Sequence, residues 1–151
     1  MDGRAASPID YIVAKGGSEL PEMRRMTMGF GEAVTTCITG FAEFSGRASR
    51  SEFWWFCLFV FLMSLVAEFV GYQVFPADPA AAQMVPAILE LIFLVPFLAA
   101  GARRLHDTGR SGWWLLLILT GVGTVLLVVW WVLGSQRERN IHGAPPARAG
   151  P

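Results

Sequence analysis

Five arginines lie in two short stretches of the chain, and their side chains are of a type that suits the binding of anions. A guanidinium group can donate two parallel hydrogen bonds to a phosphate or a carboxylate. Residues 44–54 and residues 103–114 would therefore form an anion-binding site if the fold brings them to one depth. The candidates for binding an anion or a lipid are Arg47, Arg50, Arg103, Arg104 and Arg110, with Glu52, His106, Asp107 and Trp113 as supporting residues.

The same arginines also have a structural interpretation, which stays open beside the first. Arginines collect on the cytoplasmic side of membrane proteins. In that position they could pair with Glu52 and Asp107 and hold the loops in place, while the neighbouring glycines permit tight turns.

Catalysis is a third possibility, with His106 as a general base oriented by Asp107 or with the two residues as metal ligands. Adjacent residues point in different directions on a helix, which is unfavourable for either role. His142 is the only other histidine, and Cys37 and Cys57 form no CxxC pair. We therefore expect no metal site, no cofactor and no enzymatic activity.

Two carboxylates, Glu68 and Glu90, interrupt otherwise apolar segments, where a charge is costly. They lie at similar depths and could face one another, and a shared proton would then offer a pathway for protons or cations. The alternative is that each lies near the outer head groups and is hydrogen-bonded to a neighbour or to water.

The composition indicates that much of the chain is surrounded by a medium other than water. Of its 151 residues, 54% are hydrophobic and only 16% are charged. Lys plus Arg and Asp plus Glu number 12 each, and this balance argues against a nucleic-acid partner. The expected fold is an all-α membrane protein, in which an N-terminal amphipathic helix precedes three transmembrane helices.

Three apolar segments are the expected spans. Residues 53–75 would make a helix of about 34 Å, against about 30 Å of hydrocarbon. Residues 85–102 form the shortest segment, with Pro86 in its first turn and Pro96 kinking the helix. Residues 113–133 carry no charge and have a tryptophan pair at each end, which suits two aromatic belts.

The third segment has an alternative, because Gly121 and Gly123 lie near its centre. A re-entrant hairpin that turns there would place both tryptophan pairs at one interface, provided that protein shields its irregular backbone. Segment length favours the full span.

Before the spans, the apolar residues of 28–44 recur at three- and four-residue intervals, which predicts an amphipathic helix too short to cross a bilayer. It could lie at the interface or pack on the membrane domain. Residues 1–27 read as a flexible extension, residues 28–143 as the membrane domain and residues 144–151 as a flexible tail.

The distribution of basic residues predicts the orientation. The N-terminal region and the loop from Arg103 to Arg110 are basic, whereas residues 76–84 contain no basic residue. The positive-inside rule therefore places the N-terminus in the cytoplasm. Three full spans would put the basic C-terminal residues outside, and the hairpin alternative would put them inside.

Two motifs resemble those of the domain of unknown function 805 family, a family of small bacterial inner-membrane proteins. They are F-S-G-R-A-S-R-S-E-F-W-W at residues 44–55 and R-R-L-H-D-T-G-R-S-G-W-W at residues 103–114. A weaker third match is Gly134 followed by Asn140, Gly143 and Pro145. The resemblance covers about residues 28–146 and implies a multi-pass protein of the inner membrane, but no reaction.

Two functions follow as hypotheses. The first is a non-enzymatic module whose Arg-rich cytoplasmic face binds anionic lipid or a partner protein. The second is a subunit of a small transporter or channel that uses Glu68 and Glu90. The expected partners are membrane lipids, with a homo-oligomer or another membrane protein as further possibilities.

Overall fold

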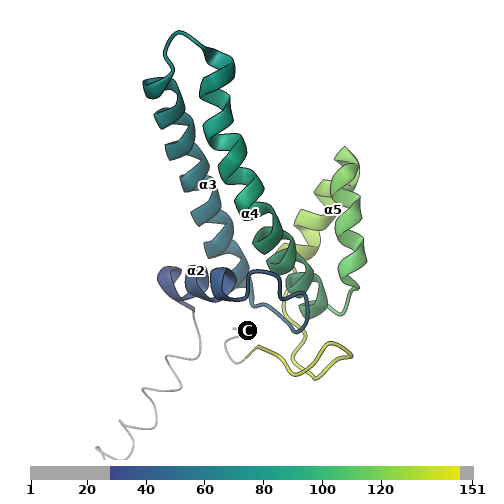
Figure 1. The fold of residues 1–151 in the computed structure, drawn as a ribbon. Coiled ribbons are helices and arrows are strands. Elements are labelled where there is room, and N and C mark those ends of the chain that lie inside the picture. Colours follow the sequence, from purple (N-terminus) through teal and green to yellow (C-terminus); the bar gives the residue numbers. More distant parts are fainter. Residues whose placement is uncertain (1–27, 147–151) are drawn as a thin grey trace, which may run out of the picture.

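The computed structural model describes residues 28–146, and this part of the chain is all-helical, without a β-strand (Figure 1). The predictions for residues 1–27 and for residues 147–151 lie outside the described residues. The elements, in chain order, are α2 (Phe30–Thr39), α3 (Arg50–Val74), α4 (Pro79–Asp107), the 3₁₀-helix η1 (Gly112–Leu119) and α5 (Gly121–Val132).

Helices α3 and α4 form a long hairpin, and these two helices are long and apolar enough to cross a membrane. Helix α3 begins where the Ser49 hydroxyl accepts a hydrogen bond of 3.2 Å from the Glu52 amide. That bond satisfies one of the amide groups that a helix leaves unpaired at its start. The predicted span over residues 53–75 thus matches α3, which begins three residues earlier.

Helix α4 is much longer than the predicted segment over residues 85–102. It begins at Pro79 because the Asp78 carboxylate accepts hydrogen bonds of 3.1 Å from two amide groups of its first turn. Pro86 therefore lies inside the helix, and its prediction as a first-turn residue was wrong.

The prediction of one continuous helix over residues 113–133 was also wrong, because η1 ends at Leu119 and α5 begins at Gly121. The rings of Trp114 and Trp130 are 5.5 Å apart, although a straight helix would separate the two residues by about 24 Å. The segment is a hairpin. A Cβ at Gly123 would lie 2.5 Å from the Leu117 carbonyl oxygen, so the turn requires glycine at that position.

Helix α2 lies across the base of α3 and is shorter than the predicted helix over residues 28–44 (Figure 1). Its Ala33 and Cys37 are buried, and the ring of Phe30 contacts that of Trp55 with the centroids 5.8 Å apart. Two placements were expected for this segment, at the membrane interface or packed on the membrane domain. In the structure, α2 packs on α3 through these contacts.

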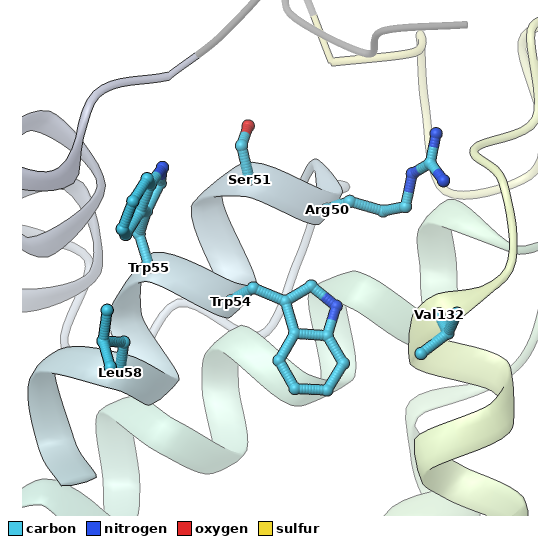
Figure 2. A pocket seen from close by; sticks show the side chains of 6 residues that line it. All are labelled: Arg50, Ser51, Trp54, Trp55, Leu58 and Val132. Atoms are coloured by element: carbon cyan, nitrogen blue, oxygen red, sulfur yellow. The ribbon is translucent and has the colours of Figure 1, made fainter.

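The apolar core lies at the end of the molecule where all the helices meet, and not along the whole hairpin. Phe53 of α3 and Trp131 of α5 are in ring contact there, at 4.7 Å between centroids. On the outer side of the same end, the first turns of α3 and the end of α5 border an open groove (Figure 2). Towards the other end only α3 and α4 continue.

Candidate functional site

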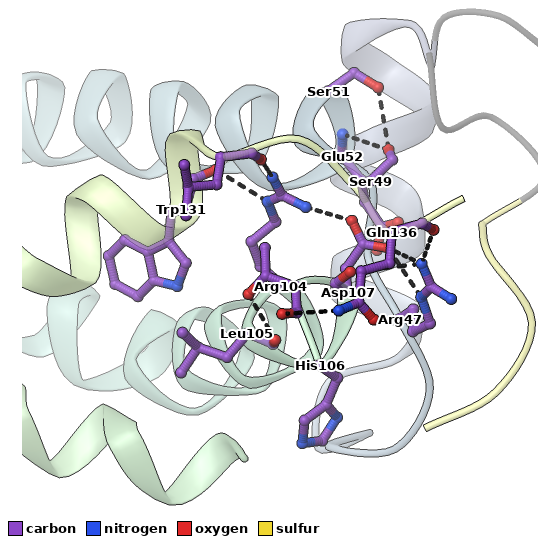
Figure 3. Close-up of polar contacts among 12 residues, drawn as sticks. Arg47, Ser49, Ser51, Glu52, Arg104, Leu105, His106, Asp107, Trp131 and Gln136 are labelled. Atoms are coloured by element: carbon purple, nitrogen blue, oxygen red, sulfur yellow. Dashed lines mark hydrogen bonds and ion pairs between the residues drawn. The ribbon is translucent and has the colours of Figure 1, made fainter. Parts of the chain in front are cut away.

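Three segments that are distant in the sequence meet at the end of the molecule that holds the core (Figure 3). They are residues 44–52, residues 103–112 and residues 131–146. The Ala48 amide donates to the Arg103 carbonyl oxygen at 3.1 Å, and the Gln136 amide donates to the Asp107 carbonyl oxygen at 3.1 Å. The segments interlock around a group of charged side chains, which we call the arginine–carboxylate cluster: Arg47, Glu52, Arg103, Arg104 and Asp107.

Asp107 is at the centre of this cluster and pairs with two arginines. One carboxylate oxygen lies 2.9 Å from the Arg47 guanidinium, and the other accepts a hydrogen bond from Arg104. The three side chains are 0–1% exposed. Ions removed from water to this extent are tolerated only when they are paired and hydrogen-bonded. The pairing therefore has a structural role, whatever else the residues do.

Arg47 also fixes the segment that closes the fold. Its guanidinium donates to the carbonyl oxygens of Glu138 at 2.8 Å and of Gly143 at 3.3 Å, and to that of Gln136. Positive φ angles at Gly46 (82°) and Gly143 (125°) permit the turns on either side. One arginine thereby joins residues near the start of α3 to residues near the end of the described chain.

Arg104 fixes the hairpin of η1 and α5 through hydrogen bonds to backbone carbonyl groups. Its side chain donates to the Trp131 carbonyl oxygen at 3.0 Å and to that of Leu133. The last carbonyl groups of a helix have no partner within the helix, so Arg104 satisfies groups that α5 itself cannot. In return, the Trp131 indole N–H donates to the Gly101 carbonyl oxygen at 3.3 Å.

The third ion pair of the cluster joins Glu52 to Arg103 at 2.8 Å and lies beside the thiol of Cys37. The Arg103 guanidinium is 3.7 Å from Cys37 Sγ, and its Nε is buried without a partner among the described residues. Burial raises the pKa of the Cys37 thiol to about 11, with a smaller contribution in the same direction from Glu52, while Arg103 opposes the change. This pair ties α2 to both long helices.

His106 connects two loops through both of its ring nitrogens. Its Nε2 accepts from the Gly112 amide at 3.2 Å, so Nδ1 carries the proton and donates to the Gly46 carbonyl oxygen at 3.1 Å. The ring stacks on that of His142, with the centroids 3.8 Å apart. Backbone groups thus engage both ring nitrogens, and His106 joins the loop at Gly46 to the loop at Gly112.

The remaining sequence candidates lie outside the cluster. Arg50 borders the groove, Arg110 lies over the Trp130 ring at 4.6 Å, and the Trp113 side chain is highly exposed. The structure thus brings Arg47, Arg103 and Arg104 together as internal ion-pair residues. It leaves Arg50 and Arg110 nearer the surface.

Gln136 was not among the predicted site residues, and Asn140 was named only in the weaker third match to the family. Both bond the closing segment, residues 134–146, to the end of α4. The Asn140 amide donates to the His106 carbonyl oxygen and to the Gln136 side chain, at 2.9 Å each. Asn140 and Gly143 also form a small bridge of two backbone hydrogen bonds. The signal was present in the sequence, because an Asn three residues before a Gly is a turn pattern.

Glu68 and Glu90 are both exposed on the outer faces of α3 and α4. Neither takes part in an ion pair among residues 28–146. The pathway for protons or cations that was suggested for them stays a prediction.

Comparison with known proteins gives a consistent result. A family model described as "Protein of unknown function (DUF805)" matches residues 41–144. Inner membrane protein YhaH of Escherichia coli strain K12 is 31% identical over 114 residues, which cover 72% of this chain and 91% of YhaH. Inner membrane protein YhaI of the same strain is 32% identical over 113 residues, which cover 72% of this chain and 90% of YhaI. No solved structure gives a significant match.

Proposed function

The chain belongs to the DUF805 family, and on that premise we propose that it is an inner membrane protein without enzymatic activity that binds anionic phospholipid at its cytoplasmic face. In this proposal α3 and α4 cross the bilayer. The hairpin of η1 and α5 enters from the cytoplasmic side and returns to it. The residues that carry the binding are Arg50 and Arg110.

Support for the topology comes from the interlocked end of the molecule. Both ends of the η1–α5 hairpin are bonded to the cluster, through Arg104 at one end and through the loop after Asp107 at the other. Helix α5 spans Gly121–Val132 and is about 18 Å long, well short of about 30 Å of hydrocarbon. Because the arginines gather at this end and the loop around Asp78 has none, the positive-inside rule favours a cytoplasmic position for this end.

The observation that carries lipid binding is the excess of positive charge at the same end. In the cluster, three guanidinium groups face two carboxylates. Over the three segments that meet at this end, seven arginines stand against three carboxylates. A basic residue near an anionic bilayer surface contributes about 1 kcal/mol of attraction, so this end is suited to phosphatidylglycerol or cardiolipin head groups.

The absence of enzymatic activity is proposed on the geometry of His106. Both ring nitrogens are engaged by backbone groups, and Asp107 is occupied by two arginines. A general base needs a free nitrogen within hydrogen-bond reach of its substrate.

Native mass spectrometry of the detergent-solubilised full chain tests the lipid proposal. We expect more bound phosphatidylglycerol than phosphatidylcholine of the same acyl composition, and loss of that preference in Arg50→Gln/Arg110→Gln. The matched control is Arg137→Gln, which removes one exposed positive charge of the closing segment and should keep the preference. A wild-type protein that binds the two lipids equally would overturn the proposal.

The topology has its own test, which uses reporters fused after Pro151. A cytoplasmic fluorescent reporter should be bright and a phosphatase reporter inactive. An active phosphatase would show that the segment after α4 crosses the bilayer completely.

A further inference from the structure

Glu90 is a carboxylate near the middle of α4, and it lies far from both surfaces of a bilayer that α4 crosses. Eleven residues, or about 17 Å of helix, separate Glu90 from Pro79 at the outer end of α4. Thirteen residues, or about 20 Å, separate it from Arg103 of the arginine–carboxylate cluster. With about 30 Å of hydrocarbon between these ends, acyl chains surround the carboxyl group unless another polypeptide covers it. Glu68 differs, because it lies only six residues, or about 9 Å, from the outer end of α3.

Glu90 lies on a face of α4 that is covered at its cytoplasmic end and open further out. At the cytoplasmic end, a Cβ at Gly101 would lie 3.2 Å from side-chain atoms of Leu115 and of Trp131, which belong to the η1–α5 hairpin. Glu90 precedes Gly101 by eleven residues, which is three turns, so the two residues lie on the same face. Around Glu90 this face is exposed, and its residues recur at intervals of four, three and four: Gln83, Ala87, Glu90 and Leu94.

The described chain, residues 28–146, supplies no partner for the Glu90 side chain. Its three ion pairs use only Glu52 and Asp107 as carboxylates, and no hydrogen bond within these residues reaches Glu90. A polar group without a hydrogen-bond partner is costly in hydrocarbon, and ionisable residues of membrane helices almost always pair with one another or face a protein interior. These properties favour an interaction surface whose partner presents a polar group at the same depth.

A second copy of the chain meets this requirement by symmetry. Two copies with the same orientation in the membrane are related by a two-fold axis along the bilayer normal, which brings each residue of α4 to the depth of its counterpart. Two Glu90 side chains at that axis can share one proton, so that one carboxyl group donates a short, charge-assisted hydrogen bond to the other carboxylate. The small side chain of Ala87, about one turn away, permits the close approach of backbones that membrane helix pairs require.

We infer that the outer part of α4 is the interface of a homodimer, in which Glu90 pairs with Glu90 of the second copy. This inference rests on the part of the proposed function in which α4 crosses the bilayer, and it is independent of the lipid that the cytoplasmic face binds. The η1–α5 hairpin covers the cytoplasmic part of the same face in each copy. The second copy therefore covers the part that the hairpin leaves open.

Energy transfer between two copies in a bilayer tests the inference. Donor and acceptor fluorescent proteins are fused after Pro151, and the full chain is reconstituted in vesicles of phosphatidylethanolamine and phosphatidylglycerol at increasing ratios of lipid to protein. We expect the wild type to dimerise and Glu90→Gln to dimerise at least as tightly, because two amide groups can also pair. Glu90→Leu should dimerise about tenfold more weakly, the loss expected for an interhelical hydrogen bond. The matched control is Glu68→Leu, which removes the exposed carboxylate of α3 and should behave as the wild type.

Two results would overturn the inference. One is a wild type whose energy transfer does not exceed that of randomly placed monomers, which would leave Glu90 to the lipid or to a different protein. The other is a Glu90→Leu variant that dimerises as tightly as the wild type. Neither result changes the preference for phosphatidylglycerol or the activity of the topology reporters, so failure of this inference is distinct from failure of the proposed function. A monodisperse elution profile of Glu90→Leu in detergent excludes misfolding as the reason for weaker association.

Discussion

Different interactions hold α3 and α4 together at the two ends of their hairpin. At the end of the arginine–carboxylate cluster, buried ion pairs join three distant segments. At the other end, the backbones of the two helices approach closely at Gly71 and Ala82, and a Cβ at Gly71 would overlap the Ala82 carbonyl oxygen. Acyl chains are as apolar as leucine, so the hydrophobic effect does not drive two helices together within a bilayer. Close packing of their backbones stabilises the contact instead.

The difference between the ends shows what the buried arginines of the two motifs do for the fold. A guanidinium that is buried and bonded to several carbonyl groups, as in Arg47 and Arg104, fixes chain segments. Arg50 and Arg110 are only partly buried and lie outside the three ion pairs of the cluster.

Asp107→Asn should have the largest effect on stability. It leaves the buried guanidinium groups of Arg47 and Arg104 without a counter-charge, and breaking a buried pair in this way costs about 3–5 kcal/mol. The measurement is thermal unfolding in detergent, monitored as the fraction of protein that remains monodisperse at each temperature. Glu68→Gln is the matched control, because it removes an exposed carboxylate from α3 and should change the free energy of unfolding by less than about 0.5 kcal/mol. Equal stability of the two variants would contradict a structural role for the cluster.

Gly71→Ala tests the opposite end and should have a smaller effect. The new methyl group meets a backbone carbonyl that cannot rotate away, and overpacking of this kind costs about 1–3 kcal/mol. Gly31→Ala in α2 is the control, because a Cβ there meets nothing within 4 Å. It should stabilise α2 by up to about 1 kcal/mol through helix propensity. If Gly71→Ala is as stable as Gly31→Ala in the same thermal assay, the close approach of α3 and α4 is not a constraint.

The smallest of the expected effects concerns the alkylation rate of Cys37 and not the stability of the protein. Its thiol pKa is about 11, against an ordinary value of 9.0, so at pH 8 it holds about a hundredfold less thiolate than an exposed cysteine. In a Cys57→Ser background, alkylation by iodoacetamide should be slow at pH 8 and should keep accelerating up to about pH 11. A rate that levels off near pH 9 would show that water reaches this side of the cluster freely.

The two long helices could be predicted because an apolar run of that length is typical of a membrane-spanning helix and rare in soluble proteins. The start of α4 could not be found from hydropathy, because Asp78 and Pro79 define it by hydrogen bonding and by a fixed φ angle. Hydropathy instead indicated a start at Val85, with Pro86 in the first turn. Capping residues were therefore a better guide to this boundary than hydrophobicity.

The third segment shows two sequence signals in conflict. Its length and its tryptophan pairs favoured a span, whereas the basic residues after it favoured a hairpin. The structure has the hairpin, because Thr120 caps α5 by accepting from the Gly123 amide at 3.2 Å and glycine alone fits at that turn. The site was predictable as a gathering of arginines. Which of them face inwards depends on the closing segment, which approaches from more than 80 residues away in the chain, since Arg47 and Gln136 are separated by 89 residues.

The contacts of Arg47 have a consequence for biosynthesis. Its carbonyl partners at Gln136, Glu138 and Gly143 lie 89, 91 and 96 residues further along the chain. A ribosome must therefore synthesise the chain as far as Gly143 before Arg47 acquires its full set of acceptors. Until then the nascent chain has both long helices but lacks the hydrogen bonds from Arg47 to the closing segment. A chain truncated before Gln136 would therefore contain both membrane helices without these bonds.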